Sequence, residues 1–411
     1  MDNSQKNILD MNARGESIYT MRSALRMQFP NTGCPVPMRV KDWERTLSLR
    51  SHAKSTRSVE DAECFTFAAT LRYKMRTPLR DNTELCTPLE TSCFVKFAWK
   101  AVDKSQGAFA ERKLICTDLD DLLRMRQTPC LPHAIHEFKL PNDAGLAAWS
   151  IYRDLVRRTE KDREGTMRVK RARSVHLLAM EACGDMTLSD YLCSKQTSSN
   201  DIVQIFLMLI HALAALSKAG ISHNDLHLRN IVVQVIPSTV VSFSGRVFRT
   251  SVVPIIIDWD MGCSTRQKNR SLRDYGHVGI FNTHNPVFDL FGVIKSLRWE
   301  MSVRSHPKFK GTVMSHDISA LLVATLEAAF SNVVQKYPWL FAFYIQNEDG
   351  DRTRCVQQTM YMPNPEATTP VAEWPSGVRR MTPSFDTLQS MLHTLIETNS
   401  GPENDAPRFT F

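Results

Sequence analysis

The sequence predicts an α+β fold, with a small sheet-rich part followed by a larger helical part. Strand-like stretches begin near Phe65, and an apolar strand returns at 175–180. A long apolar stretch at 201–219 predicts a buried helix. Two further strand-like stretches, 231–236 and 252–257, flank a predicted hairpin in the second part.

The composition bounds the size of the fold and the kinds of partner. The chain has 411 residues, of which 43% are hydrophobic and 23% charged. This is enough to bury a sizeable core and indicates one large two-lobed unit, or two domains with tails. The formal charge is +8 and the isoelectric point about 9.0. Such a modest excess suits a protein that handles phosphate or meets acidic partners, and alone it does not indicate a nucleic-acid binder.

Cysteine usage and hydropathy indicate the cellular compartment. The ten cysteines are scattered, and no two form a C-x-x-C pair. In a chain of this length, that predicts reduced thiols in an intracellular protein of the cytoplasm or nucleus. The N-terminus has no apolar signal segment. The most apolar stretch, 202–216, contains Gln204 and His211, so it predicts a buried helix and no membrane span.

Composition divides the chain into four parts. Residues 1–64 are expected to be a polar, basic extension, 65–180 a sheet-rich lobe, 181–396 a helical lobe and 397–411 a tail. A basic stretch at 153–173 is expected to be an exposed insertion in the first lobe, because it holds nine Lys or Arg and four acidic residues.

The first lobe contains a candidate functional lysine. Alternation over 92–97 predicts a half-buried strand that carries Lys96. An ordinary solvated lysine would fit the same strand, and Lys100 is a rival. Further on, Ile115, Leu119, Leu122 and Leu123 fall at helical spacing and predict an amphipathic helix in the stretch 108–125, with Glu111 near its start.

The second lobe begins with a strand, a turn and helices. After the apolar strand at 175–180, the turn 181–184 leads to a short helix. Asn200 and Asp201 are expected to cap the long apolar helix, and Gly220 to end it. This helix delivers the chain to a polar loop, and a buried helix is a rigid platform for polar side chains that must hold their positions.

The polar loop contains His223, Asp225 and Asn230 in the spacing H-x-D-x-x-x-x-N, and the strand-like stretch 252–257 ends at Asp258. This arrangement is the pattern of a phosphoryl-transfer site. A carboxylate at Asp225 can orient an acceptor hydroxyl and take its proton, whereas His223 is expected to pack inward and bond to the backbone. The oxygens of Asn230 and Asp258 are ligands that magnesium on ATP phosphates prefers.

With these residues the sequence resembles the protein kinase-like superfamily, which implies a bilobal fold and the cofactors ATP and Mg²⁺. The resemblance implies that Lys96 holds the α- and β-phosphates and that Glu111 pairs with Lys96. It also implies that backbone groups of Glu181 and Cys183 bind the edge of the adenine. Asp225 would then be the catalytic base.

The sequence departs from the kinase pattern in two places. No glycine occurs between Gly33 and Gly107, so the glycine-rich loop that usually closes on the phosphates is missing. Either another turn, such as 76–84, does this job less closely, or phosphate binding relies on Lys96 and the metal. The Ala-Pro-Glu that usually follows the activation segment, here 263–285, is also absent.

Two stretches beyond the loop also resemble protein kinases. Residues 285–297 are similar to the kinase F-helix, whose buried Asp, here Asp289, ties down the backbone of the catalytic loop. Residues 379–396 are similar to the last kinase helix. The resemblance therefore covers about 65–396 and favours a protein kinase over a small-molecule kinase.

Three functions follow from these observations. The first is phosphoryl transfer to protein serine or threonine, rather than tyrosine, by a divergent kinase that resembles those of large DNA viruses. His227 and Asp260 favour a small-molecule phosphotransferase of the aminoglycoside or choline kinase type. The glycine-poor loop favours a pseudokinase scaffold, although a scaffold has no chemical need to keep Lys96, Asp225, Asn230 and Asp258 together.

Overall fold

The computed structural model describes the chain in stretches separated by residues whose structure is left out. The described residues are 47–49, 64–78, 84–100, 114–125, 127–140, 174–184, 186–194, 197–243, 246–269, 289–297, 316–336 and 384–399. They contain both helices and antiparallel sheets, so the α+β class is confirmed.

The described residues fall into two compact units. The sheet unit comprises the described residues within 12–116 and 132–182. The helical unit comprises those within 117–131 and from 183 onward. One of the boundaries lies between Ala182 and Cys183, inside the turn that follows the apolar strand at 175–180.

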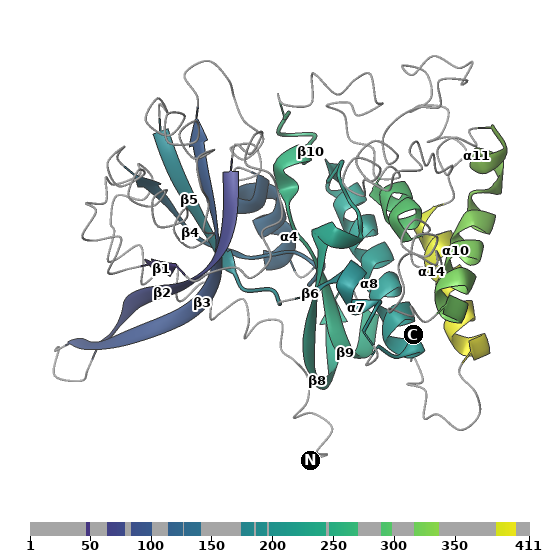
Figure 1. Cartoon of the computed structure of the whole chain (residues 1–411), viewed down its shortest axis with the longest axis horizontal. Coiled ribbons are helices and arrows are strands. Elements are labelled where there is room, and N and C mark those ends of the chain that lie inside the picture. Colours follow the sequence, from purple (N-terminus) through teal and green to yellow (C-terminus); the bar gives the residue numbers. More distant parts are fainter. Residues whose placement is uncertain are drawn as a thin grey trace, which may run out of the picture. The chain divides into compact units, whose positions relative to one another are not determined.

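The sheet unit is built on five antiparallel strands in the order β1-β2-β3-β5-β4 (Figure 1). The strands predicted from Phe65, through Lys96 and at 175–180 are confirmed. An additional edge strand, β1, lies within 1–64, where the sequence had indicated no strand. In chain order the strands are β1 Leu47–Leu49, β2 Cys64–Pro78, β3 Glu84–Lys100, β4 Ala134–Leu140 and β5 Ser174–Glu181.

The β2–β3 hairpin extends well beyond the strands that pair with it on either side. Its pairing runs out to Pro78 opposite Glu84, whereas β5 joins β3 only from Cys93 onward and β1 joins β2 only as far as Leu71. The outer half of the hairpin therefore consists of two strands alone and projects from the rest of the sheet (Figure 1). Of the stretch 76–84, considered above for phosphate binding, residues 76–78 and Glu84 belong to the far end of this hairpin, and 79–83 lie outside the described residues.

Of the helix predicted in the stretch 108–125, the structure describes residues 114–125, and these are helical as far as Arg124, with a widened turn before α4. Residues Ile115–Leu119 form a π-helical turn, and Asp120–Arg124 continue as α4. The apolar residues at helical spacing are all buried, as an amphipathic helix requires: Ile115, Leu119, Leu122 and Leu123. Glu111 lies outside the described residues.

The long apolar helix, α8 (Ser199–Lys218), is buried along almost its whole length. Its N-cap is Ser198, whose hydroxyl accepts a hydrogen bond from the Asp201 N–H at 3.0 Å. The expectation that Asn200 and Asp201 cap the helix is therefore wrong, because both already lie in its first turn. Serine is as good a cap as either residue, and composition alone does not choose among neighbouring candidates.

Gly220 ends α8 as predicted. Its φ of +69° is in the left-handed region, and a Cβ at this position would lie 2.7 Å from the side chain of Thr265. By length and composition α8 could cross a membrane, but 78% of its apolar window is buried inside the fold. It packs against β9 and α14 (Figure 1), so its apolar faces are those of a core helix.

Short strands and turns position the polar loop. β8 and β9 form the predicted hairpin, which is longer than expected, and β6 completes a three-stranded sheet in the order β6-β8-β9. β7 and β10 form a separate antiparallel pair. The elements are β6 Met186–Thr187, α7 Leu188–Tyr191, β7 Ile221–Ser222, β8 Ile231–Phe243, β9 Arg246–Ile256 and β10 Cys263–Ser264.

Helices complete the unit. Residues 289–297 are helical, in agreement with the expectation for that stretch. α10 (His316–Ala329) is followed by α11 (Ser331–Lys336), and α14 spans Phe385–Asn399. The last helix was predicted within 379–396. α14 starts inside that region and ends three residues after it. α8, α10 and α14 pack against one another (Figure 1).

Candidate active site

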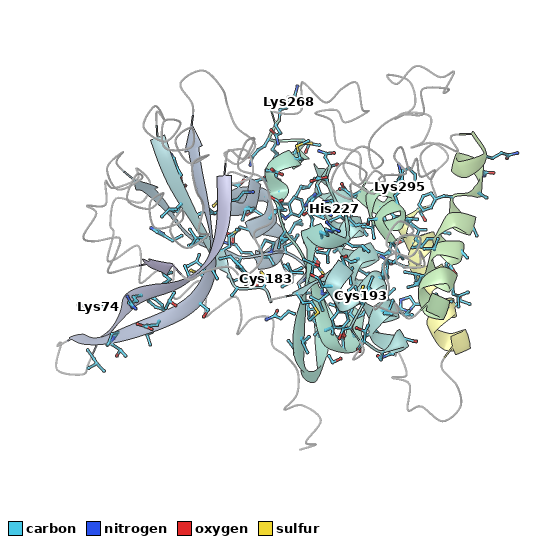
Figure 2. The ribbon with its side chains drawn as sticks, in the orientation of Figure 1. Lys74, Cys183, Cys193, His227, Lys268 and Lys295 are labelled. Carbon is cyan, nitrogen blue, oxygen red and sulfur yellow. The ribbon has the colours of Figure 1, made fainter. Side chains whose placement is uncertain are left out.

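The polar loop is held at both ends by regular structure. It begins after β7, which pairs with β10 through Ser222 opposite Cys263. It ends in a 3₁₀ turn, Leu228–Asn230, that leads directly into β8. His227, labelled in Figure 2, caps this turn. Its Nδ1 accepts a hydrogen bond from the Arg229 N–H at 3.2 Å. The residues between these ends are therefore presented from fixed supports.

Asp289, in the helix at 289–297, holds the backbone of the loop. Its Oδ2 accepts a hydrogen bond from the His223 N–H at 2.8 Å, and its Oδ1 accepts one from the Asn224 N–H at 2.7 Å. Burial raises the pKa of this carboxyl to about 7, although the two hydrogen bonds act in the opposite direction. The contact that the resemblance implied for Asp289 is confirmed.

His223 packs inward, as expected, and joins the loop to the strand that precedes Asp258. Its Nδ1 accepts from the Asp225 N–H at 3.2 Å, so its Nε2 carries the hydrogen and donates to the Ile257 carbonyl at 2.8 Å. The ring also lies 4.6 Å, centroid to centroid, from that of Trp259. Burial lowers the pKa of His223. A neutral imidazole with a fixed tautomer is therefore part of the scaffold.

Asp225 and Asn230 are in direct contact. The Asn230 Nδ2 donates to the Asp225 backbone carbonyl at 2.8 Å and lies 3.3 Å from its carboxylate Oδ2. The Asn230 N–H donates to the His227 carbonyl at 2.8 Å. Within the described part of the chain, the amide oxygen of Asn230 makes no hydrogen bond. The amide thus uses its nitrogen to hold the loop and leaves its oxygen for another partner.

Asp258 is placed beside Asn230 by the backbone of the strand that precedes it. The Ile257 N–H donates to the Asn230 carbonyl at 2.9 Å. Asp258 then adopts a left-handed conformation, with φ 64° and ψ 65°, and starts a 3₁₀ turn, Trp259–Met261. Trp259 is fully buried, and its Nε1 donates to the Ile256 carbonyl at 3.0 Å. The turn therefore directs the chain sharply away from the strand at the acidic residue.

The structure thus brings Asp225, Asn230 and Asp258 together from two distant stretches of sequence. Both carboxylates act on the pKa of His223 in the upward direction, which places them near the same imidazole. Among the described residues, no three His, Cys, Asp or Glu side chains form a closed metal-binding group. One carboxylate and one amide oxygen nevertheless fit magnesium, which is commonly held by one or two carboxylates together with substrate phosphates and water.

The segment that follows the Asp258 turn is attached to residues 117–121. The Ser264 Oγ donates to the buried Asp118 Oδ2 at 2.5 Å. The Gln267 Nε2 contacts the Thr117 hydroxyl. Arg266 lies 3.7 Å from Asp118 and 3.5 Å from the Asp121 carboxylate. The turn with Asp258 is therefore held on its far side by side-chain contacts.

The residues predicted to bind the nucleotide are described mostly in the sheet unit. Lys96 lies on β3 between Thr66 of β2 and Leu178 of β5, and it is 4% exposed. The Glu181 N–H donates to the His133 carbonyl at 3.0 Å. Cys183 is buried and belongs to the helical unit. Lys96 and Glu181 thus belong to the sheet unit, and Glu111 lies outside the described residues, so the roles of all three stay predictions.

Sequence reasoning missed two asparagines that support the Asp258 turn. Asn224 donates from its side chain to the Met261 carbonyl at 3.0 Å. Asn269 donates to the Asp260 carbonyl at 2.6 Å and to the Gly262 carbonyl at 3.1 Å. The signal for Asn224 was its place beside Asp225, since asparagine tolerates the left-handed backbone that sharp turns need. No sequence pattern around Asn269 indicates its role.

Comparison with known proteins gives a short local similarity. No family model matches the sequence. The chain is 46% identical over 56 residues to "Serine/threonine-protein kinase unc-51" of Caenorhabditis elegans. The match covers 13% of this chain and only 6% of that protein's length. It indicates a kinase-like relationship over a limited stretch. Because this relative is a nematode protein, the resemblance to kinases of large DNA viruses stays a prediction.

Proposed function

We propose that the chain is a protein kinase that transfers the terminal phosphate of ATP to serine or threonine hydroxyls. In this proposal the sheet unit is the smaller lobe of a bilobal kinase fold and the helical unit the larger lobe. The observation that carries it is the arrangement of Asn230, which contacts Asp225 through its side chain and Ile257, next to Asp258, through its backbone.

Asp225 is the proposed base. It accepts the proton of the substrate hydroxyl while the hydroxyl oxygen forms a bond to the terminal phosphorus of ATP, and the bond from that phosphorus to the ADP oxygen breaks. Its carboxylate is partly exposed, at 24% of the side chain, so a substrate can approach it. Contact with the Asn230 amide restricts its orientation, which favours in-line attack.

Asn230 and Asp258 are the proposed magnesium ligands. When bound, Mg²⁺ neutralises charge on the phosphates that develops during transfer. The oxygen of the Asn230 amide faces away from Asp225, because the nitrogen of the same amide is bonded there. Lys96 is proposed to hold the α- and β-phosphates, with Glu111 as the partner of its ammonium group. Backbone groups of Glu181 and Cys183 are proposed to hold the adenine.

Two further observations support the class of protein and its location. The local match is to a serine/threonine kinase, which favours a protein acceptor. Six of the cysteines in the described part of the chain are free thiols, which favours a reducing intracellular compartment. The proposed partners are therefore ATP and a protein substrate in the cytoplasm or nucleus.

A small-molecule phosphotransferase is the second candidate, and one contact favours it. The His227 Nε2 lies 3.9 Å from the Asp225 Oδ2, and the Nδ1 of the same ring is an acceptor, so Nε2 carries a hydrogen that faces the carboxylate. Serine/threonine kinases usually have a lysine at this position. The histidine ring, which is more rigid than a lysine side chain, leaves less space for a substrate beside the Asp225 carboxylate. A compact hydroxyl compound would use such an approach more easily than a peptide.

Labelled ATP distinguishes these candidates. The purified chain is incubated with ATP and Mg²⁺ on generic protein substrates and on panels of amino alcohols and sugars. Asp225→Asn and Asp258→Asn are compared with wild type, and Asp386→Asn, an exposed residue at the start of α14, is the matched control. Label on protein serine or threonine that is lost in both site variants and kept in the control supports the proposal.

The other outcomes contradict it. Label on small molecules alone establishes the second candidate. If no acceptor is labelled and ATP with Mg²⁺ gives no thermal shift, the chain is a pseudokinase scaffold. Activity that survives in Asp225→Asn would show that another residue takes the proton.

A further inference from the structure

Asn224 occupies a left-handed backbone position between the proposed base and the end of β7. Its φ is +66°, in the left-handed region, and it is 3% exposed. Its backbone N–H is bonded to Asp289, so the residue cannot rotate without breaking a buried contact. Asparagine is one of the few residues besides glycine that adopt this conformation at little cost.

The side chain of Asn224 uses both amide hydrogens on the segment after Asp258. Its Nδ2 donates to the Met261 carbonyl at 3.0 Å and contacts the Cys263 Sγ at 3.3 Å. Met261 ends the 3₁₀ turn that starts after Asp258, and Cys263 starts β10. The amide therefore joins the loop to the point where this turn rejoins regular structure.

His223 and Asn224 hold the two ends of one turn. His223 donates to the Ile257 carbonyl, directly before Asp258, and Asn224 donates to the Met261 carbonyl, three residues after it. The residues from Asp258 to Asp260 lie between these two contacts. Because Asp258 is itself in a left-handed conformation, its direction depends on both ends being fixed.

We infer that Asn224 is a positioning residue that fixes the direction of the Asp258 carboxylate toward the metal of the proposed reaction. The inference rests on the proposed function, but its structural part concerns the turn alone. Asn224 acts through the Met261 carbonyl and does not touch substrate. Loss of its side chain should loosen Asp258 and leave Asp225 in place, since Asp289 and Asn230 hold the base separately.

Asn224→Gly removes the side chain and keeps the left-handed backbone. The apparent affinity for Mg²⁺ should fall about tenfold and the KM for ATP should rise, because two hydrogen bonds of about 1 kcal/mol or less are lost. The kcat at saturating Mg²⁺ should change much less than these constants. Asn224→Asp keeps the size and cannot donate, so it should weaken Mg²⁺ binding at least as much.

Thr250→Val is the matched control for a general loss of stability. Thr250 is buried in β9, and its hydroxyl donates to the Val252 carbonyl at 2.7 Å, so the nearly isosteric valine also removes a buried side-chain hydrogen bond. Its Mg²⁺ dependence should match wild type. If Thr250→Val weakens Mg²⁺ binding as much as Asn224→Gly does, the positioning role is overturned.

Alkylation of Cys263, resolved by mass spectrometry, tests the turn without any activity. Cys263 is 1% exposed and burial raises the pKa of its thiol to about 11, so it reacts only when the segment opens. Loss of the Asn224 contact raises that pKa further, which by itself slows alkylation. Faster labelling in Asn224→Gly can therefore come only from opening. Cys93, buried in the sheet unit, and exposed Cys116 serve as internal references.

The two measurements separate the inference from the proposed function. Faster Cys263 labelling in Asn224→Gly or Asn224→Asp, relative to Cys93, supports the inference, and unchanged labelling in both overturns it. If wild type binds no ATP with Mg²⁺, the proposed function fails, and labelling still decides whether Asn224 fixes the turn. Should one variant not fold, the other gives the result.

Discussion

Two segments of the helical unit are attached to helices in different ways. The polar loop is attached to the helix at 289–297 through its own backbone, because two N–H groups bind the buried Asp289. The segment 263–268 is attached to residues 117–121 largely through side chains, including Arg266, which is 74% exposed. The comparison shows that the contact with Asp289 does not depend on which side chains stand at positions 223 and 224, whereas the contacts of the segment 263–268 with residues 117–121 do depend on its side chains.

Buried backbone hydrogen bonds and exposed side-chain ion pairs also differ in how much they stabilise the fold. A buried N–H that loses its acceptor costs about 1–3 kcal/mol, whereas an exposed ion pair contributes about 0–1 kcal/mol. The loop with the proposed base should therefore be rigid in all states of the folded protein. Within the segment 263–268, the exposed ion pairs of Arg266 can be broken at lower cost than the buried contact of Ser264 with Asp118.

Asp289→Ala should have the largest effect. It leaves the N–H groups of His223 and Asn224 without their acceptor in a buried position, which costs about 2–6 kcal/mol. Denaturant unfolding should show this loss, and any phosphotransfer should disappear. Asp289→Asn, which keeps one acceptor oxygen, should lose less. A stability equal to wild type for Asp289→Ala would show that the loop is not held through this contact.

The pH dependence of stability should sharpen the comparison. The folded pKa of Asp289, about 7, is above its ordinary value of 3.8, so the folded state binds the proton more tightly than the unfolded state. This contribution to stability is fully present below pH 3.8 and is lost as pH rises to about 7. The free energy of unfolding of wild type minus that of Asp289→Asn, measured with denaturant, should decrease as pH rises across this window. A flat difference would contradict it.

Ser264→Ala should have an intermediate effect. The Ser264 hydroxyl donates to buried Asp118 and accepts from the N–H groups of Arg266 and Gln267. Its removal should cost about 1–3 kcal/mol, and the segment 263–268 should become more accessible to proteases. Limited proteolysis followed by mass spectrometry measures this. Cleavage at unchanged rates would indicate that backbone contacts hold the segment instead.

Arg266→Ala should have the smallest effect. Its pairs with Asp118 and Asp121, at 3.7 and 3.5 Å, lie on an exposed side chain and are screened by salt. We expect a loss of about 0–1 kcal/mol that disappears at high ionic strength. A larger loss that is insensitive to salt would mean that Arg266 is as important as Asp289, and the contrast between the two attachments would fail.

Much of the framework could be predicted from residue patterns. The apolar runs that became β2, β3, β5 and α8 are long and have a clear period, so local preference and burial agree there. β1 has three residues, Leu47–Leu49, and no period can be seen in so short a stretch. Its place is decided by pairing with β2, which is a contact distant in sequence.

The sequence predicted which residues form the site, but it did not predict the hydrogen bonds that hold the Asp258 turn in place. The spacing of Asp225 and Asn230 and the strand-terminal Asp258 indicated residues that the fold brings together. The hydrogen bonds from Asn224 to Met261 and from Asn269 to Asp260 depend on how two turns approach each other. No local pattern encodes such an approach. The role of Lys96 stays a prediction.

The burial of α8 has a consequence for how the protein is made. A nascent chain that has just emerged with α8 presents a segment as apolar as a membrane span. One of the elements that cover it, α14 (Phe385–Asn399), is synthesised much later. Until then the ribosome-bound intermediate must be sheltered by chaperones, because contacts so distant in sequence form late. Transcripts truncated before α14 should therefore yield aggregating or rapidly degraded polypeptides.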